Sequence, residues 1–367
     1  MTMRELTYQV SFNTPAFLGN AEQHAQWRTP PFKALLRQWW RVVKALEVGY
    51  DHRRLLGEEQ ALFGSAGDDA GGGRSKVQLR LSDWSPGAMS QRPALQRVDH
   101  PETKTRDGRP IRPDADVYLG FGPITLDAMR PAIAPAGPAV TLKLRCPKFE
   151  VDNLRKAMQL AAWFGIVGSR ARNGWGSLNI QGESLLGYDD LTEVELLKRA
   201  SASSLVDALK LDWPHGFAKR EDGKLAVWRV GKINRQEKSI DGFGSWREAM
   251  EELARIKIGF RTALKFPEEA TPHDAMQDRH VLAYPVTNHK IRGISDDKRL
   301  SSSLRFKVHE RGAKFFAVIT HVPCGIPRAF MPNPPSIEFQ QRVWSTVHQV
   351  LDTKFPERVT RIKKGVA

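Results

Sequence analysis

The sequence predicts an α+β protein with two domains, and two observations support this prediction. Its 367 residues exceed the roughly 100–200 residues usual for one domain. Short runs with the period-two alternation of β-strands are also interspersed with longer runs that have helical spacing. The sequence contains 41% hydrophobic residues, including ten tryptophans, which is sufficient to build hydrophobic cores.

The first domain is expected over residues 1–185 and begins with a strand. Residues 6–12 alternate in period two and are rich in β-formers. Thr29-Pro30-Pro31 is a typical helix start, and the apolar stripe that follows predicts a helix to about Leu46. The elements expected next are strands at 76–81, 116–121 and 140–144, a helix at 151–164, a glycine-rich loop at 165–176 and a strand at 177–181.

This order is the βαββαβ order of ferredoxin-like (RRM-like) domains. A large loop insertion is expected within it at about 64–115, because this stretch is rich in glycine, proline and arginine. A degenerate second ferredoxin-like domain is expected over 186–367. Its predicted elements are a strand at 225–233, a helix at 245–260, a loop through 273–280, strands at 281–286, 303–308 and 313–320, a helix at about 336–351 and a basic tail at 355–367.

The charge balance of the chain indicates a polyanionic partner. Lys and Arg number 56 against 41 Asp and Glu, a formal net charge of +15. Nucleic acid fits better than a membrane, because no apolar run approaches the ~20 residues of a spanning helix. The N-terminal residues lead directly into a strand without the regions of a signal peptide, and Cys146 and Cys324 have no metal-binding spacing. We therefore expect a cytoplasmic protein without cofactor, metal or structural disulfide.

The stretch FGIVGSRARNGWGSLNI at 164–180 is a candidate phosphate-binding loop. It is not a P-loop, because five residues separate Gly168 from Gly174 and Trp175 stands where the lysine would be. It is not a dinucleotide-binding turn either, because it follows a helix and enters a strand. Its N–H groups, with Arg170 and Arg172, can hold a sugar-phosphate backbone while Trp175 packs or stacks. The alternative is a tight helix-to-strand connection with incidental arginines.

Two further clusters are basic. From Trp27 to Lys44 there are five basic residues and no acidic one, so the predicted helix presents a stripe that can bind phosphates. Trp40 at its border can stack on a base, whereas Trp39 is assigned to the core. Residues 288–308 carry six Lys or Arg against two Asp. The candidate RNA-binding residues of the second cluster are Lys290, Arg292, Lys298, Arg299 and Arg305. The alternative for the first cluster is a solvated helix face, and the alternative for the second is an exposed loop.

Candidate catalytic residues are few. His24 precedes the first predicted helix and can serve as the general base of metal-free RNA cleavage, although a histidine in a polar loop is usually inert. His273-Asp274 lacks the further histidines of a phosphohydrolase. The Gly67-Asp68-Asp69 motif is similar to the metal site of nucleotide polymerases, but it leads into a run of flexible glycines. The sequence therefore predicts no catalytic residue.

Four motifs together resemble one family. They are TPAFLGN at 14–20, RTPPFKALLRQWWR at 28–41, GSRARNGWGS at 168–177 and KRLSSSLRF at 298–306. In this order they resemble the RAMP superfamily of CRISPR proteins, and more narrowly the first-numbered RAMP subunit of the Cmr (type III-B) effector complex. The sequence departs from the family pattern at Ala34, at Ile166-Val167 and at Ser303.

The resemblance implies two ferredoxin-like domains and a role in a multi-subunit, RNA-guided antiviral complex. It implies a non-catalytic subunit that binds the crRNA 3′ region and helps to capture complementary target RNA, with other RAMP subunits and the large subunit as partners. A metal-independent endoribonuclease that processes crRNA and a pure assembly subunit that contacts only proteins remain alternatives. The candidate RNA-binding residues are Arg28, Lys33, Arg37, Trp40, Arg41, Gly168, Ser169, Arg170, Arg172, Gly174, Trp175, Lys290, Arg292, Lys298, Arg299 and Arg305.

Overall fold

The computed structural model divides into two compact units, and each is described by itself. Unit 1 comprises Met1–Arg92, Gly120–Ala200 and Lys307–Glu310, and unit 2 comprises Pro93–Leu119, Ser201–Phe306 and Arg311–Ala367. Residues 93–115 of the expected insertion, with the next four residues, thus group with unit 2. The Gly67-Asp68-Asp69 motif and most of the basic tail lie outside the described residues. The structure describes residues 2–65, 73–105, 107–182, 185–187, 195–202, 204–219, 223–234, 239–267, 271–355 and 359–361.

Unit 1 contains a four-stranded antiparallel sheet with the strand order β2-β3-β1-β4. Tyr8, Val10 and Phe12 of β1 are buried at alternate positions, as the period-two pattern predicts. Leu6 lies opposite Leu144 of β3. The strands are β1 (Met3–Phe12), β2 (Gln78–Leu81), β3 (Val140–Pro147) and β4 (Leu178–Gln181).

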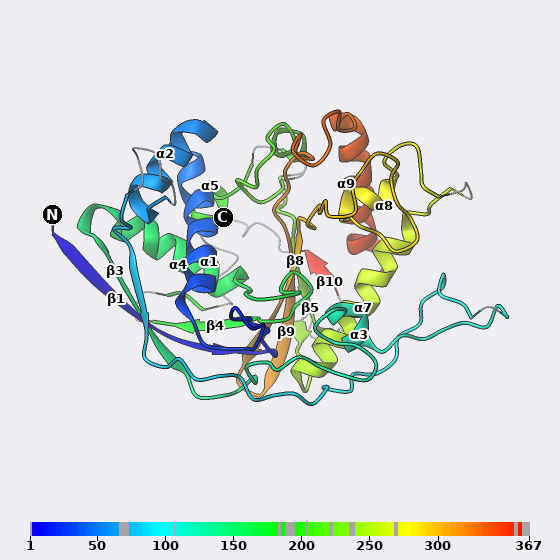
Figure 1. Cartoon of the computed structure of the whole chain (residues 1–367), viewed down its shortest axis with the longest axis horizontal. Helices are drawn as coiled ribbons and strands as arrows, with labels where there is room; N and C mark the ends of the chain where they lie inside the picture. Colours follow the sequence, from blue (N-terminus) through cyan, green and yellow to red (C-terminus); the bar gives the residue numbers. More distant parts are fainter. Residues whose placement is uncertain are drawn as a thin grey trace. The chain divides into compact units, whose positions relative to one another are not determined.

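Helices α1 (Thr29–Ala45) and α4 (Val151–Phe164) cover one face of this sheet (Figure 1). Proline occupies the first turn of α1, as predicted, and Trp39 is fully buried. Helix α4 ends at Gly165, whose N–H donates to the carbonyl of Ala161 (2.7 Å). The sequence pattern did not reveal helix α2 (His52–Phe63), which begins where the Asp51 side chain accepts hydrogen bonds from two backbone amides. The short elements η1 (Lys148–Glu150) and α5 (Glu195–Arg199) complete unit 1.

A second four-stranded sheet has the order β10-β5-β9-β8, and its residues belong to unit 2 except for Lys307–Glu310 of β8, which group with unit 1. Helices α7 (Trp246–Ala263) and α9 (Ile337–Thr353) begin at Ser245 and Ser336, whose side chains accept backbone hydrogen bonds. The two helices pack against each other. The strands are β5 (Val227–Val230), β8 (Leu304–Arg311), β9 (Lys314–His321) and β10 (Val359–Arg361), with a separate pair formed by β6 (Lys232–Asn234) and β7 (Ser239–Asp241), and two short helices are α6 (Leu205–Leu209) and α8 (Asp278–Leu282).

The fold is thus mixed α/β with antiparallel sheets, and most of the predicted elements are confirmed. Two expected strands are wrong. Residues 116–121 mostly form helix α3 (Ala115–Gly120). The backbone N–H of Tyr118 donates a helical hydrogen bond to Asp114 O (2.9 Å), and Asp116 occupies the first turn. The expected strand at 281–286 instead begins as the end of helix α8. Part of the tail, which had no predicted element, forms β10.

Candidate nucleic-acid interface

The glycine-rich loop of unit 1 has a backbone that requires glycine at two positions. Gly168 and Gly176 have φ values of +95° and +62°, in the left-handed region. A Cβ at Gly176 would lie 1.9 Å from Val167 O, and one at Gly168 would lie 2.7 Å from Phe17 O. These glycines therefore allow two segments of backbone to approach closely.

The segment 14–20 holds this loop in place by hydrogen bonds. Ser169 N donates to Phe17 O (3.0 Å), and Gly176 N donates to Pro15 O (2.9 Å). The Thr14 hydroxyl donates to Gly174 O (2.7 Å) and accepts from Ser177 N (3.0 Å). The structure therefore brings together two of the motifs on which the family resemblance depends.

Gly168, Ser169 and Arg170 form the exposed part of the loop. Arg170 has a φ of +56°, an uncommon conformation for a residue with a side chain. Desolvation by its neighbours lowers the pKa of the Arg170 guanidinium, which stays charged at neutral pH. No carboxylate pairs with Arg170 within the described residues. Its charge is therefore available to an external anion.

Two of the predicted RNA-binding residues, Arg28 and Lys33, lie at the start of α1. Arg28 donates from Nη1 to Gly19 O (2.7 Å), so Arg28 and the glycine-rich loop both bind the segment 14–20. Lys33 is half-buried. Burial and the neighbouring charge of Arg37 both lower the pKa of Lys33. Arg172 of the loop is half-buried and has contacts with other groups of the chain.

The prediction of free phosphate-binding groups at Arg37 and Arg41 needs correction, because both side chains bind Glu59 of helix α2. Arg37 Nε donates to Glu59 Oε1 (2.6 Å), Arg41 Nη2 donates to the same oxygen (2.7 Å), and Arg41 Nε bonds Oε2. Burial would raise the pKa of Glu59, but the bonds and charges of the two arginines outweigh it and lower the pKa. The cluster of Arg37, Arg41 and Glu59 therefore uses part of the predicted positive charge internally.

Trp40, which is predicted to stack on a base, and Trp175, for which packing and stacking are both expected possibilities, have buried rings. Trp40 is 1% exposed, and its Nε1 donates to Glu150 Oε2 (3.1 Å). Trp175 is fully buried and packs edge-on against Phe17, with 5.6 Å between the ring centroids. Gly174, another predicted contact, is buried as well. In this conformation neither indole offers a face to RNA.

The basic cluster of unit 2 is exposed, but carboxylates and backbone carbonyls already bind much of it. Lys290 donates to Asp296 (2.8 Å) and Arg292 pairs with Asp274 (3.1 Å). Exposed pairs of this kind contribute little stability, so they can exchange a carboxylate for a phosphate. Lys298 donates to Ala329 O (2.7 Å) and Arg299 to Lys298 O (2.9 Å), whereas Arg305 is 5% exposed and does not face solvent, contrary to prediction.

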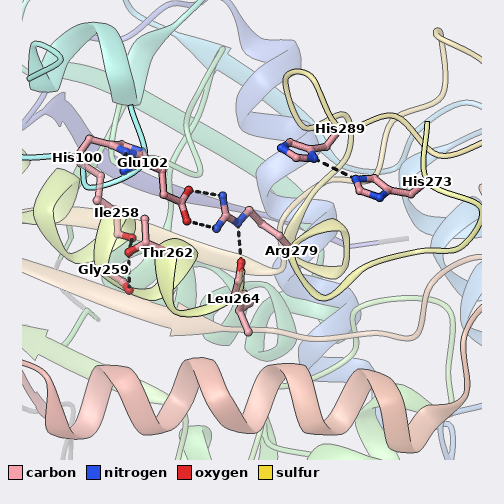
Figure 2. A network of polar contacts seen from close by, with 9 residues as sticks. All are labelled: His100, Glu102, Ile258, Gly259, Thr262, Leu264, His273, Arg279 and His289. Atoms are coloured by element: carbon pink, nitrogen blue, oxygen red, sulfur yellow. Dashed lines mark hydrogen bonds and ion pairs between the residues drawn. The ribbon is translucent and has the colours of Figure 1, made fainter. Parts of the chain in front are cut away.

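Stacked rings hold the segment that carries Lys290 and Arg292. His273 binds this segment through its backbone, donating to Lys290 O (2.8 Å) and accepting from Arg292 N (2.8 Å). Its Nε2 is 3.0 Å from Nδ1 of His289, as Figure 2 shows. The His289 ring stacks on Phe266, with 3.7 Å between centroids. His273-Asp274 is therefore a structural element of unit 2.

A second histidine beside this stack is held in the neutral form. His280 Nδ1 accepts from Gln277 N (3.0 Å) and its Nε2 donates to His289 O (2.9 Å), so neither nitrogen can take another proton without losing a bond. Burial lowers the pKa of His280 to about 4. Nearby, Arg279 binds Glu102 through two 2.7 Å bonds and donates to Leu264 O (2.9 Å) (Figure 2). In the described part of the chain, no three His, Cys, Asp or Glu side chains are placed to hold a metal ion.

No family model matches the chain. It is 25% identical over 308 residues to the CRISPR system Cmr subunit Cmr1-1 of Pyrococcus furiosus, covering 80% of this chain and 79% of the relative. Among the helices that the structure describes, none could span a membrane.

Solved structures give a weaker likeness. The apo crystal structure of Cmr1 from Pyrococcus furiosus has a TM-score of 0.45 with 19% identity, and each chain is fully covered. Two chains from structures of the type III-B Cmr-beta complex bound to cognate target RNA have TM-scores of 0.41 and 0.42, with 10% and 12% identity. The matches cover 94% of this chain and 98% and 99% of the matched chains. The chain, with its four motifs in the same order, is thus similar to a Cmr1 subunit over 80% of its length.

Proposed function

We propose that the chain is a non-catalytic, RNA-binding subunit of a type III-B Cmr effector complex, in which it binds the crRNA 3′ region and helps to capture target RNA. The similarity to a Cmr1 subunit supports membership of the complex. Its partners are then crRNA, target RNA, the other RAMP subunits and the large subunit. Base pairing between guide and target supplies the sequence specificity, so this subunit needs only contacts to the backbone.

We also propose that both units are ferredoxin-like. In unit 1 the main elements, apart from helix α2 between α1 and β2, follow the order β1, α1, β2, β3, α4, β4, and the sheet order is β2-β3-β1-β4. In unit 2 the main elements follow the order β5, α7, β8, β9, α9, β10, and the sheet order is β8-β9-β5-β10. Position by position the two orders correspond, which is what two βαββαβ units predict.

The observation that carries the RNA-binding proposal is the exposed turn at Gly168, Ser169 and Arg170. Hydrogen bonds to the segment 14–20 fix its backbone. An arginine held on a rigid loop can bind a phosphate with two parallel N–H bonds at little cost in side-chain entropy. Arg28, bonded to the same segment, adds a second cation.

Equilibrium binding of the full chain to a labelled single-stranded RNA, measured over a range of salt concentrations, tests the proposal. Arg170→Ala should weaken binding about fivefold for every RNA sequence and reduce the slope of log K against log salt by about one. The matched control is Arg155→Ala, which removes an exposed arginine of α4 that lies 3.9 Å from Asp152. An unchanged affinity, or a loss for only some sequences, contradicts the proposal.

The same preparation distinguishes the other two interpretations. Cleavage of repeat RNA in the presence of EDTA, abolished by His24→Ala, would indicate an endoribonuclease. Absence of RNA binding by the full chain, combined with binding to partner subunits, would indicate a pure assembly role. Neither result is expected.

A further inference from the structure

We propose that Phe121 and Arg170 together bind one nucleotide of single-stranded RNA, with the phenyl ring stacked on the base and the guanidinium bonded to the phosphate. This inference rests on the RNA-binding function proposed above and adds the element that the two buried tryptophans cannot supply. Phe121 is a large apolar side chain that is 65% exposed. An aromatic ring exposed on a strongly basic protein is typical of a stacking platform for single-stranded nucleic acid.

Phe121 belongs to a tight turn that lies in contact with Arg170. Ile124 N donates to Gly120 O (3.0 Å), which closes the turn around Phe121 and Gly122. Gly122 has a φ of +109°, and a Cβ there would lie 3.4 Å from Arg170 Nη2. The Arg170 guanidinium therefore lies against the residue next to Phe121. A base and its own phosphate are separated by only a few bonds, so one nucleotide can reach both groups.

The core of unit 1 supports this turn from below. A Cβ at Gly120 would lie 3.2 Å from Nε1 of Trp175 and 2.8 Å from Ile124 Cδ1, so the turn packs tightly on the buried indole. Trp175 is itself fixed against Phe17. The ring of Phe121 is thus carried by a rigid base, and little backbone entropy is lost when a nucleotide binds.

A second exposed aromatic residue belongs to a segment that is hydrogen-bonded to the residues preceding Arg28. Trp84 is 50% exposed. Trp27 N donates to Ser85 O (3.1 Å), and the Gln26 side chain donates to Trp84 O (3.2 Å), so Trp84 lies alongside the residues that precede Arg28. Unit 1 therefore has one exposed aromatic residue next to Gly122, which Arg170 contacts, and another bonded through its backbone to the residues that precede Arg28. The neighbouring cations favour a polyanion over an apolar protein surface as the occupant.

The test is equilibrium binding of the full chain with Phe121→Leu, which keeps an apolar side chain but removes the aromatic face. Affinity for single-stranded RNA should fall about fivefold to tenfold. The salt slope should stay unchanged, because no charge is lost. Affinity for heparin, a polyanion without bases, and for an RNA duplex should also stay unchanged. Phe121→Tyr should restore binding to RNA, and the fluorescence of a 2-aminopurine in the bound strand should be quenched by the unmodified protein and not by Phe121→Leu.

The matched control is Phe149→Leu, the same substitution at an aromatic residue of unit 1 that is 69% exposed. It should leave RNA affinity unchanged. If Phe121→Leu has no effect while Arg170→Ala still weakens binding, the stacking inference is overturned and the proposed function stands. If neither substitution matters, the proposed function fails as well. A loss of partner-subunit binding without a loss of RNA binding would show that the ring contacts protein, which also overturns the inference.

Discussion

The glycine-rich loop of unit 1 and the basic segment of unit 2 differ in what their cations contact. In unit 1, Arg170 stands on a loop that backbone bonds hold in place, without a carboxylate partner among the described residues. In unit 2, Lys290 and Arg292 pair with Asp296 and Asp274. Both stretches carry an excess of basic over acidic residues in sequence. The difference shows that the folded chain, through the acidic residues it brings near, decides how much positive charge reaches a ligand.

Helix α1 makes the same point within unit 1. The helix itself contains no acidic residue, yet Glu59 of α2 binds two of its arginines. The Glu59 side chain is 1% exposed, so the pairing lies at the edge of the hydrophobic core. A charge stripe on one helix is therefore an upper limit to the charge available for RNA.

A substitution that disrupts the glycine-rich loop should have the largest effect, because the exposed position of Arg170 depends on the conformation of this loop. Gly176→Ala places a Cβ 1.9 Å from Val167 O at a φ of +62°. We expect the free energy of unfolding to fall by about 3 kcal/mol from overpacking and strain together, and RNA affinity to fall with it. Urea denaturation followed by tryptophan fluorescence measures the first effect.

Gly49→Ala is the control, because Gly49 has the same φ of +62° but no atom within 4 Å of its Cβ position. It should cost only about 1 kcal/mol, the strain of the left-handed conformation. Equal losses for the two variants would mean that the loop relaxes around the new methyl group.

Removing the carboxylate of Glu59 tests whether the internal pairing of Arg37 and Arg41 limits the positive charge that is available to RNA. Glu59→Gln leaves two arginines without their counter-charge, so the free energy of unfolding should fall by about 2 kcal/mol, less than for a fully buried pair because both arginines can reach water. The freed arginines should make RNA binding tighter and its salt dependence steeper. Glu58→Gln, at a carboxylate that pairs with Lys44 and Arg54 and is 34% exposed, is the control and should change stability by less than about 1 kcal/mol. Unchanged RNA affinity in Glu59→Gln would place α1 away from the RNA.

Acidification should lower the free energy of unfolding through His280 of unit 2, and this effect should be smaller than those of the substitutions above. Burial lowers the pKa of His280 to about 4 from its ordinary value of 6.5, and the nearby charge of Arg279 lowers it further. The unfolded chain therefore binds more protons than the folded one between these values. The stabilisation is complete above about pH 6.5 and is lost as the pH falls towards 4. At pH 5 the loss should be on the order of 1–2 kcal/mol.

Thermal unfolding of the full chain at pH 7.5 and pH 5.0 measures this loss. His280→Leu should show a smaller difference between the two pH values, although it is less stable at both. His24→Leu, at an exposed histidine, is the matched control. An equal pH dependence in His280→Leu and in the unmodified protein would assign the acid sensitivity to other groups.

Local patterns predicted the framework of the fold but not the pairing of its charges. The apolar stripe of α1 and the glycine after α4 are visible in sequence, because each depends on neighbouring residues. The partnership of Arg37 and Arg41 with Glu59 depends on the position of a helix with weak amphipathic spacing, and no local rule supplies it. The sequence predicts stacking for Trp40 and leaves packing and stacking open for Trp175, because it cannot distinguish a buried tryptophan from one that faces solvent. The sequence does not reveal the exposed position of Phe121, because it predicts a strand at 116–121 where most residues form helix α3.

The central position of β1 in the sheet of unit 1 has a consequence for synthesis. Val10 lies opposite Val140 on one side and opposite Ile180 on the other. During synthesis, β1 therefore keeps both of its edges unpaired until β3 (Val140–Pro147) is made, and one edge unpaired until β4 (Leu178–Gln181) is made. Pairing across such separations is slow, and open edges recruit other strands. The nascent chain is thus most exposed to aggregation, and most dependent on chaperones, before β4 is made.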